Sequence, residues 1–319
     1  MKTLSKNRTK KQVKSPKADM KEIFFKEILE KIDQVNADEW EHYVKTNFDL
    51  APRNAFTNYH YKRLNRINLM LEMVLNNRTT PLYATFKQIS ERGGKVKKGA
   101  KGMLIEFFSW SIKHKETGQS ISVREFNELS KEQKKKYKVF PISRFYRVFN
   151  IDDVDTSEMD ITIIENEIEE EPEISLNEDI DKFIKSIVDT KGLVIKEKFS
   201  AGASYNRTTD VVTMPLKDIC VSMDRYYSAL FHEIIHWTGA EHRLNRTKGA
   251  RFGDSIYSFE ELIAELGSMI ICLDFNINSE FINSLRYIKG WSKSSPENRE
   301  KEFRNAFIQS QTATAFLTK

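Results

Sequence analysis

The stretch His232-Glu-Ile-Ile-His236 constrains the fold more than any other part of the chain. The six residues before it, 226–231, contain neither Gly nor Pro, so the stretch is expected to lie in a helix. Side chains four residues apart share one face of a helix, and both imidazoles can therefore reach one metal ion. From its place after the first His, the Glu233 carboxylate can take a proton from a water on that ion. The pattern is typical of metal-dependent hydrolases, most often peptidases.

Apolar neighbours indicate that this helix is partly buried. Buried polar groups need partners, and a metal ion supplies one, whereas a surface helix could carry two histidines by chance. Gly239 predicts the end of the helix in a left-handed cap conformation. The next helical segment is 257–271, where Ser258 is the expected N-cap of a capping box. The apolar neighbours are Ala229, Leu230, Phe231, Ile234, Ile235 and Trp237.

Two residues are candidates for a third ligand, which a catalytic zinc site needs beside its open position. Glu261 lies on the second helix, on the same face as Glu265 four residues later. Glu261 would bind the ion, and Glu265 would accept from the second ring nitrogen of a ligand His and orient it. His242 is the alternative, because the spacing from His236 through Gly239 fits the pattern of three-His sites. The residues alone leave both ligands open.

The charge distribution divides the 319 residues into a basic half, an acidic connector and a nearly neutral half. Residues 1–150 hold 32 Lys and Arg against 16 Asp and Glu, so their net charge is +16. Residues 151–180 hold 13 acids and no base, and residues 181–319 hold 19 bases against 17 acids. The sum, +16 −13 +2, is the formal net charge of +5. A length of about 150 residues per domain and this division both predict two domains.

Basic and aromatic residues are interleaved in the first half, which is typical of surfaces that bind single nucleic-acid strands. Residues 51–110 carry 11 basic and 3 acidic side chains. Within them Tyr83, Lys97, Lys98 and Lys101 are the preferred contacts. Phe107 is expected in the core instead, because it belongs to the strand-like segment 103–110.

Both halves of the chain resemble a known family. Residues 232–239, Arg243, Arg246 and the segment 260–267 are similar to the zincin-like metallopeptidase domain of ArdC-type antirestriction proteins, which plasmids and other mobile elements carry. The segments 61–65, 81–88, 93–102 and 146–150 are similar to the single-stranded-DNA-binding domain of that family. Arg63 stands where the family usually has Gly, and Tyr83 where it usually has Trp.

The resemblance implies a set of site residues. The ligands would be His232, His236 and Glu261, which favours Glu261 over His242, and Glu233 would be the catalytic base. Two His and one carboxylate accept zinc, the expected metal, or manganese. The expected DNA contacts are Asn65, Arg66, Tyr83, Thr85, Gln88, Lys97, Lys98 and Lys101.

The sequence as a whole predicts an α+β protein of two domains. The expected parts are a disordered basic segment at 1–18, a basic single-stranded-DNA-binding domain at 19–151, an acidic linker at 152–179 and a zincin-like metallopeptidase domain at 180–319. Helices are expected at 19–35, 64–75, 85–88, 180–190, 280–287 and 300–317, and strands at 103–110, 145–150, 194–199 and 210–214.

The predicted function is antirestriction by a single-stranded-DNA-binding protein with a zinc peptidase centre. The alternatives are a DNA-binding protein with a structural or idle metal site, and a metalloprotease whose basic half binds RNA or a protein. No apolar run approaches the ~18 residues of a membrane span. Two cysteines without a spacing motif favour the cytoplasm. The sequence names no protease substrate.

Overall fold

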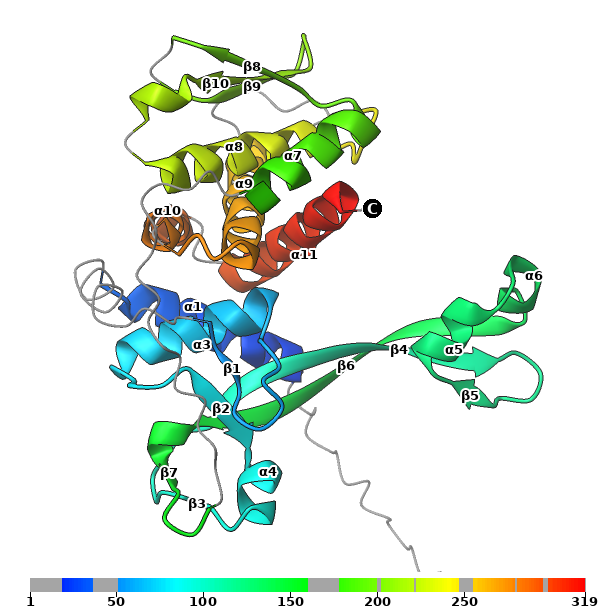
Figure 1. The fold of residues 1–319 in the computed structure, drawn as a ribbon, viewed down its shortest axis with the longest axis vertical. Helices are drawn as coiled ribbons and strands as arrows, with labels where there is room; N and C mark the ends of the chain where they lie inside the picture. Colours follow the sequence, from blue (N-terminus) through cyan, green and yellow to red (C-terminus); the bar gives the residue numbers. More distant parts are fainter. Residues whose placement is uncertain are drawn as a thin grey trace, which may run out of the picture.

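The computed structural model describes residues 19–36, 51–159, 178–199, 202–220, 222–246, 255–278, 280–294 and 298–318. Within them, helices and strands are mixed in both halves of the chain. Figure 1 shows the two halves stacked along the long axis, with residues 19–159 below and residues 178–318 above. The predicted α+β class and the organisation in two domains are confirmed.

The N-terminal half is built on a five-stranded sheet of order β1-β2-β6-β4-β5. The pair β1–β2 is parallel, and the other three pairs are antiparallel. A separate two-stranded sheet pairs β3 with β7. In chain order the elements are α1 (Met20–Gln34), β1 (Arg53–Asn54), α3 (Arg63–Leu75), β2 (Leu82–Thr85), α4 (Phe86–Glu91), β3 (Lys95–Val96), β4 (Met103–His114), β5 (Ser120–Ile121), α5 (Val123–Glu128), α6 (Lys131–Lys134), β6 (Tyr137–Asn150), η1 (Ile151–Asp153) and β7 (Val154–Asp155).

Two helices of this half begin at the side-chain caps that the sequence predicts. The Asp19 carboxylate accepts a hydrogen bond from the backbone amide of Lys21 at the start of α1. Thr85 and Gln88 form a reciprocal capping box at the start of α4. Such caps satisfy backbone amides that have no partner within the helix, which is why the pattern fixes these boundaries.

Strands β4 and β6 are longer than expected and form an arm that reaches away from the rest of the molecule (Figure 1). They pair from Met103↔Val148 to His114↔Tyr137. The short strand β5 and helices α5 and α6 fold at the far end. We call residues 105–146 the arm, and residues 115–136 its tip.

Helix α3 lies along the open edge of β4 at the base of the arm. The Asn65 side chain donates to the Glu106 carbonyl at 2.8 Å and accepts from the Glu106 amide at 2.9 Å, as a neighbouring strand would. Asn68 donates to the Leu104 carbonyl at 2.8 Å. These contacts satisfy backbone groups that an edge strand otherwise leaves unpaired.

The C-terminal half packs helices beneath a three-stranded sheet of order β8-β10-β9. Strand β10 is parallel to β8 and antiparallel to β9. The elements are α7 (Glu178–Lys191), β8 (Val194–Lys198), β9 (Ser204–Asn206), β10 (Val211–Pro215), η2 (Lys217–Ile219), α8 (Met223–Thr238), α9 (Ser255–Asp274), α10 (Phe281–Ser294) and α11 (Arg299–Leu317). The expected helices and strands of this half are all present, within a few residues at most ends.

Helices α8 and α9 approach each other closely in the core of this half. Phe231, Ile235 and Trp237 of α8 are fully buried. Gly267 of α9 faces Ile235, and a Cβ atom there would lie 2.8 Å from the Ile235 side chain. The absence of a side chain at Gly267 therefore allows the close approach of the two helices that carry the His and Glu residues described below.

Polar contacts join the two halves. Arg299 of α11 donates to both carboxylate oxygens of Asp33 in α1, at 2.7 and 2.9 Å. Arg66 of α3 is buried and donates to the Leu273 carbonyl near the end of α9. A paired, directional contact of this kind fixes the orientation of one half on the other.

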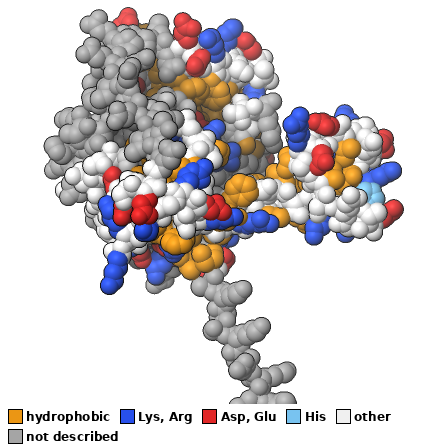
Figure 2. Space-filling view, turned by 60° about the horizontal axis from the view of Figure 1, so that its bottom comes forward, with side chains coloured by type: hydrophobic (Ala, Val, Ile, Leu, Met, Phe, Trp, Pro, Cys, Tyr) orange, Lys and Arg blue, Asp and Glu red, His pale blue; other side chains and the backbone are white. Residues whose placement is uncertain are grey.

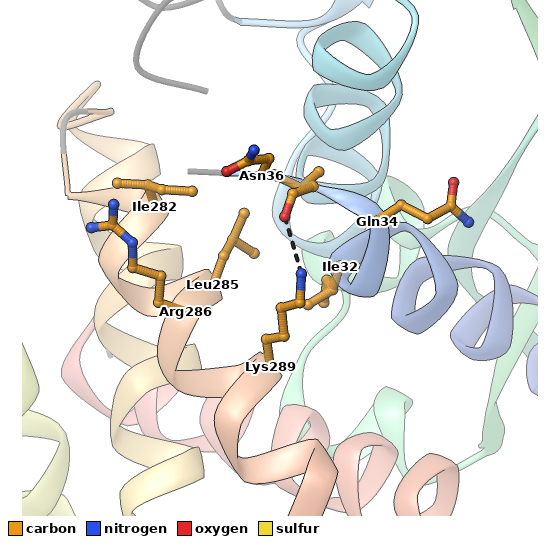
Figure 3. Close-up of a pocket in the computed structure, with 8 residues that line it drawn as sticks. Ile32, Gln34, Asn36, Ile282, Leu285, Arg286 and Lys289 are labelled. Carbon is orange, nitrogen blue, oxygen red and sulfur yellow. Dashed lines mark hydrogen bonds between the residues drawn. The ribbon is translucent and has the colours of Figure 1, made fainter. Parts of the chain in front are cut away.

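A pocket of about 420 Å³ lies on the same interface, between the end of α1 and helix α10 (Figure 3). Ile32 and Leu285 contribute apolar walls, and Lys289 donates to the Val35 carbonyl across it at 3.3 Å. The described residues of the two halves therefore leave a space between them at this end of the interface.

One predicted helix start and one predicted cap conformation are wrong, although α8 does end at Gly239 as expected. Helix α9 begins at Ser255, so Ser258 lies inside the helix and does not cap it. Gly239 follows α8 with a φ of −77°, which is not left-handed. Its Cβ would lie 2.9 Å from the Glu260 carboxylate and 3.0 Å from the Arg246 guanidinium. Gly239 is thus explained by close approach of side chains, rather than by backbone conformation.

The expected segment 1–18 lies outside the described residues, as does 160–177 of the expected linker. Residues 152–159 are folded onto the N-terminal half: β7 pairs with β3, and Lys95 Nζ lies 3.1 Å from the Glu158 carboxylate. None of the described helices combines the length and apolar character that crossing a bilayer requires. Cys272 is buried and Cys220 half-buried, both as free thiols.

Candidate functional site

Helix α8 places His232 and His236 one turn apart on the same face. Ser222 caps the helix, and an unbroken run of sixteen helical residues follows. The Nε2 atoms of the two imidazoles lie 3.1 Å apart. Both side chains are mostly buried, because the apolar neighbours on either side pack into the core. The expected convergence of two ring nitrogens is present.

Helix α9 brings Glu261 to the same point. Its two carboxylate oxygens lie 3.4 Å from His232 Nε2 and 3.4 Å from His236 Nε2. One ligand atom from each of the three residues falls within 4.8 Å of the others. Among the described residues this is the one group of His, Cys, Asp or Glu side chains close enough to hold an ion.

The second ring nitrogen of each imidazole faces a carboxylate. His232 Nδ1 lies 3.4 Å from Glu265, as the sequence predicts. His236 Nδ1 lies 3.5 Å from Glu260, a residue for which the sequence analysis predicts no role. Both contacts favour a proton on Nδ1 and leave Nε2 as the electron-pair donor. Helical spacing alone does not connect Glu260 to His236, because the two residues lie on different helices.

Arg246 holds Glu260 in place. Its guanidinium donates to both oxygens of that carboxylate, at 2.8 and 3.1 Å. It also donates to the Ile235 carbonyl at 2.7 Å and to the Thr238 hydroxyl at 2.9 Å. The loop after α8 is therefore tied both to the end of that helix and to α9.

Burial and ion pairing compete in setting the protonation of the cluster. Burial opposes the charged form of His232, but Glu261 and Glu265 outweigh it and raise its pKa to about 10. The pKa of His236 is also raised, because Glu260 and Glu261 overcome its burial. Burial works against the ionised form of Glu261 too, yet both imidazoles hold its pKa far below the usual range. The site therefore stabilises positive charge, whether a proton or a metal cation carries it.

Glu233 lies on α8 directly after His232 and is half-buried. It has no hydrogen bond or ion pair with another described residue, in contrast to Glu260, Glu261 and Glu265. A carboxylate beside the ligand cluster that is not engaged in holding the structure is available for proton transfer.

His242, the alternative ligand, lies away from the cluster. Its side chain is 64% exposed, and its Nε2 lies 3.4 Å from Asp210. The neighbouring Arg243 is buried: it stacks on Trp237 and pairs with Asp210 at the turn before β10. His242 lies instead in the loop after α8, which the ion pairs of Arg243 with Asp210 and of Arg246 with Glu260 hold in place.

Three expected DNA contacts are structural, which corrects the prediction. Tyr83 is fully buried, and its hydroxyl donates to Glu72 and contacts the Leu69 carbonyl. Arg66 is buried at the interface between the halves, and Asn65 is paired with the edge of β4. None of these side chains presents a free surface to a nucleic acid.

The other five expected contacts differ in exposure. Thr85 and Gln88 are half-buried and form the capping box of α4, with Gln88 also paired to Asn54. Lys97, Lys98 and Lys101 are exposed on the turn that leads into β4, and Lys97 donates to the Asp152 carbonyl at 2.8 Å. The three lysines thus form a basic surface next to the base of the arm.

Large aromatic side chains are exposed on the arm, in a strand where the sequence predicts that Phe107 lies in the core. Phe107 is 54% exposed, while Tyr83 is 0% exposed, the reverse of the prediction. Strand β4 carries large apolar residues both in its buried first part and in its exposed later part, so its composition did not show where the core ends. The exposed aromatics of the arm are Phe107, Phe108, Trp110, Phe140 and Tyr146.

Two family models match the chain in succession. The model of the N-terminal domain of the anti-restriction factor ArdC matches residues 18–149. A model described as a zincin-like metallopeptidase matches residues 181–307. The first covers the sheet and the arm, and the second covers the cluster of His232, His236 and Glu261.

Curated relatives include proteins of bacterial origin. A protein named DNA primase TraC from Escherichia coli is 28% identical over 304 residues, which cover 91% of this chain and 26% of the primase. The chain therefore spans about a quarter of that relative's length. The protein y4eC from Sinorhizobium fredii is 28% identical over 267 residues, which cover 82% of this chain and 80% of y4eC.

Two solved structures share the fold over nearly the full length. The metal-free crystal structure of the antirestriction ArdC protein from the R388 plasmid has a TM-score of 0.60 and 25% identity, covering 94% of this chain and 97% of that one. The Mn(II)-bound structure of the same protein has a TM-score of 0.61. With both domain models matched in order and a solved ArdC structure aligned from end to end, the chain belongs to the ArdC family of antirestriction proteins.

Proposed function

We propose that this protein binds single-stranded DNA through its basic N-terminal half and carries a metal-dependent peptidase centre in its C-terminal half. Its role would be to protect the DNA of a mobile element in the cytoplasm of a new host. The observation that carries the proposal is the convergence of His232, His236 and Glu261, with both imidazoles oriented by further carboxylates.

The donor set fits a divalent metal ion. Two Nε2 atoms and a carboxylate oxygen within 4.8 Å of one another are the atoms that a first-row divalent ion prefers. The carboxylates on both Nδ1 atoms make the imidazoles better donors and fix their rings. Zinc and manganese are both compatible with these ligands, and the manganese-bound relative is consistent with either.

The remaining residues support hydrolysis. A divalent ion held by the three ligands would polarise a substrate carbonyl and make water more acidic. We assign Glu233 as the general base that accepts a proton from that water and then donates it to the leaving amine. His232 and His236 hold the ion, and Glu265 and Glu260 keep their rings in position.

Metal content and activity of single variants test this assignment. His232→Ala is expected to lose bound metal in elemental analysis. Glu233→Gln is expected to keep the metal and lose peptidase activity. His242→Ala is the matched control, because that side chain is exposed and outside the cluster, and it should keep both. Full metal in Glu261→Ala together with loss in His242→Ala would show that the ligand assignment is wrong.

The same variants separate the peptidase proposal from an idle metal site. If Glu233→Gln protects incoming DNA from restriction as well as the unaltered protein does, proteolysis is not part of antirestriction. Loss of protection with retained metal and DNA binding would instead require the peptidase step.

The DNA proposal is supported by the charge of the N-terminal half and by the family that it matches. Residues 1–150 carry +16, and the relatives include a protein named DNA primase. Lys97, Lys98 and Lys101 are exposed, and are the part of the expected contact set that remains available.

Salt dependence of binding tests the lysines. Each phosphate contact releases counterions, so three lost contacts should reduce the slope of log affinity against log salt by about two units for a single strand. We expect that change when Lys97, Lys98 and Lys101 are all replaced by Ala in the full chain, with oligodeoxythymidylate as the probe. An unchanged slope would place the phosphate contacts elsewhere on the protein.

A further inference from the structure

The arm presents one continuous open face. In an antiparallel pair, residues opposite each other point to the same side, and every second residue shares that side. The register of β4 and β6 places Phe107 opposite Arg144, Ser111 opposite Phe140, and Lys113 opposite Lys138. On this side Ile105 is buried in the core at the base of the arm. We call the rest of the side the open face; its members are Phe107, Ser109, Ser111 and Lys113 on β4 and Lys138, Phe140, Ile142, Arg144 and Tyr146 on β6.

The composition of the open face is unusual for a protein surface. It holds three aromatic residues, three basic residues and no acidic residue. Phe107, Phe140 and Tyr146 are 54%, 48% and 42% exposed. Contiguous exposed apolar area of this kind marks a binding surface more often than a solvated one. Figure 2 shows hydrophobic side chains along the arm with Lys and Arg beside them.

The cations of the open face are not neutralised within the protein. Lys113, Lys138 and Arg144 are exposed, and none of them forms an ion pair with another described residue. By contrast, Glu106 is on the other side of the ribbon and lies 4.0 Å from Lys21. The positive charge is therefore directed to solvent.

The other side of the ribbon is partly covered. Ile112 is 2% exposed, in the stretch of β4 that α5 contacts. Phe145 packs on Phe24 of α1. Between these points Phe108 and Trp110, which contact each other edge to face, are exposed, as are Ser143 and Pro141 opposite them. On the open face, by contrast, no residue from Phe107 to Lys113 or from Lys138 to Tyr146 is buried, so the open face offers the longer uninterrupted track.

The combination of aromatic rings and cations favours a polyanion with planar groups. Protein–protein interfaces are depleted in Lys, whereas the arm adds five lysines at its tip to the two on the open face. Single strands expose bases that stack on aromatic rings and phosphates that attract Lys and Arg. Phe107 and Tyr146 meet edge to face with ring centroids 6.4 Å apart, so each ring still has surface for a base.

We propose that the open face of the arm is a stacking platform for a single nucleic-acid strand, with bases on Phe107, Phe140 and Tyr146 and phosphates near Lys113, Lys138 and Arg144. This inference rests on the proposed binding of single-stranded DNA and names the surface responsible. The lysines of the turn before β4 lie near the base of the same arm.

The test uses the full chain and two sets of variants. Phe107, Phe140 and Tyr146 are replaced by Leu, which keeps an apolar strand residue and removes the aromatic face. The matched control is Phe199→Leu, because Phe199 is 84% exposed and lies in the other half. Affinity for oligodeoxythymidylate and for its ribose counterpart is measured by fluorescence anisotropy over a range of salt concentrations, and thermal unfolding verifies the fold.

The two sets should act differently. Each lost ring is expected to weaken binding about ten-fold at every salt concentration, because stacking is not ionic. Replacement of Lys113, Lys138 and Arg144 by Ala is expected to reduce the salt slope by about two units. Equal effects on both oligonucleotides identify a platform for either strand, and a stronger effect on the deoxy strand identifies a DNA platform.

Three outcomes would overturn the inference, and they are distinguishable. Binding by the unaltered chain that is unchanged in both sets of variants removes the arm and leaves the proposed DNA binding intact. Absence of binding by the unaltered chain, even at low salt, removes both proposals. If the variants keep DNA binding and instead lose binding to anionic lipid vesicles or to a protein partner, the open face belongs to that other class of partner.

Discussion

The metal centre and the arm are both rich in functional side chains, but their surroundings are opposite. In the cluster around His232 each ring nitrogen and nearly every carboxylate has a partner, and the groups are mostly buried. On the open face of the arm the cations have no partner among the described residues and the aromatic rings are half exposed. A preorganised centre is built from satisfied groups, whereas an interaction surface consists of groups that are still unsatisfied.

Loss of Arg246 from the metal centre is expected to have the largest effect on the free energy of unfolding. Glu260 is 2% exposed, and Arg246→Met would leave that buried carboxylate without its main partner. Removal of one member of a buried pair typically costs about 3–5 kcal/mol. Chemical denaturation should therefore show a marked loss in the free energy of unfolding. Arg225→Met, at an exposed position of α8, is the control and should change little.

A stability close to that of the unaltered protein in Arg246→Met would contradict this picture of the centre. It would mean that solvent or another residue replaces the guanidinium, and that the contrast in burial between the two regions is smaller than the distances suggest.

The two carboxylates that orient the imidazoles differ in burial, so they test how burial affects metal binding. Glu260 and Glu265 each face the Nδ1 atom of one imidazole, but Glu260 is 2% exposed and Glu265 is 21% exposed. Loss of such an orienting group typically lowers metal affinity by about 10–100-fold. We expect Glu260→Gln to approach the upper end and Glu265→Gln the lower end in titrations against a competing chelator. The reverse order would show that burial does not determine how strongly a carboxylate orients its histidine.

The metal centre was largely predictable from the sequence, because its geometry is local. Four residues make one helical turn, so His232 and His236 converge wherever the helix lies, and Glu261 and Glu265 share a face for the same reason. The choice between Glu261 and His242 was not local, and the family resemblance favoured Glu261. Glu260 was missed because its role depends on Arg246, which reaches it only through the loop between the helices.

The N-terminal half was predictable in its elements and not in its surface. Caps at Asp19 and Thr85 gave correct helix starts, since they depend on neighbouring residues alone. Tyr83 and Phe107 were assigned in reverse. Both are aromatic residues in strands, and only the tertiary structure determines that β2 lies beneath α3 while β4 extends beyond the body.

Protonation gives a pH test that applies to the buried centre and not to the arm. The pKa of His232 is raised to about 10 from an ordinary value of 6.5. A raised pKa adds stability that is complete below about pH 6.5 and is lost as the pH rises through about 10. The metal-free protein should thus become less stable over this window. Metal competes with the same protons, so its affinity should increase with pH over the same range.

Denaturation curves of chelator-treated protein at successive pH values measure the effect. In His232→Gln the free energy of unfolding should depend much less on pH between about 6.5 and 10. If the slope is the same in that variant, another group is responsible for the pH dependence.

The smallest effect on the centre is expected from removal of the tip of the arm. His114 and Tyr137 face each other in the register of β4 and β6, so a two-residue Asn-Gly turn can replace residues 115–136. The tip contributes six basic and four acidic residues and contacts the rest of the protein mainly through the arm. We expect a loss of about 1.5–3 kcal/mol in the free energy of unfolding, because removal of β5 and α5 uncovers the Ile112 side chain, which is 2% exposed. Metal affinity should be unchanged, and affinity for a single strand should decrease slightly at low salt, where the tip's net charge of +2 is least screened. A fall in metal affinity would show that the arm and the centre are coupled, and the two regions could then no longer be treated as independent.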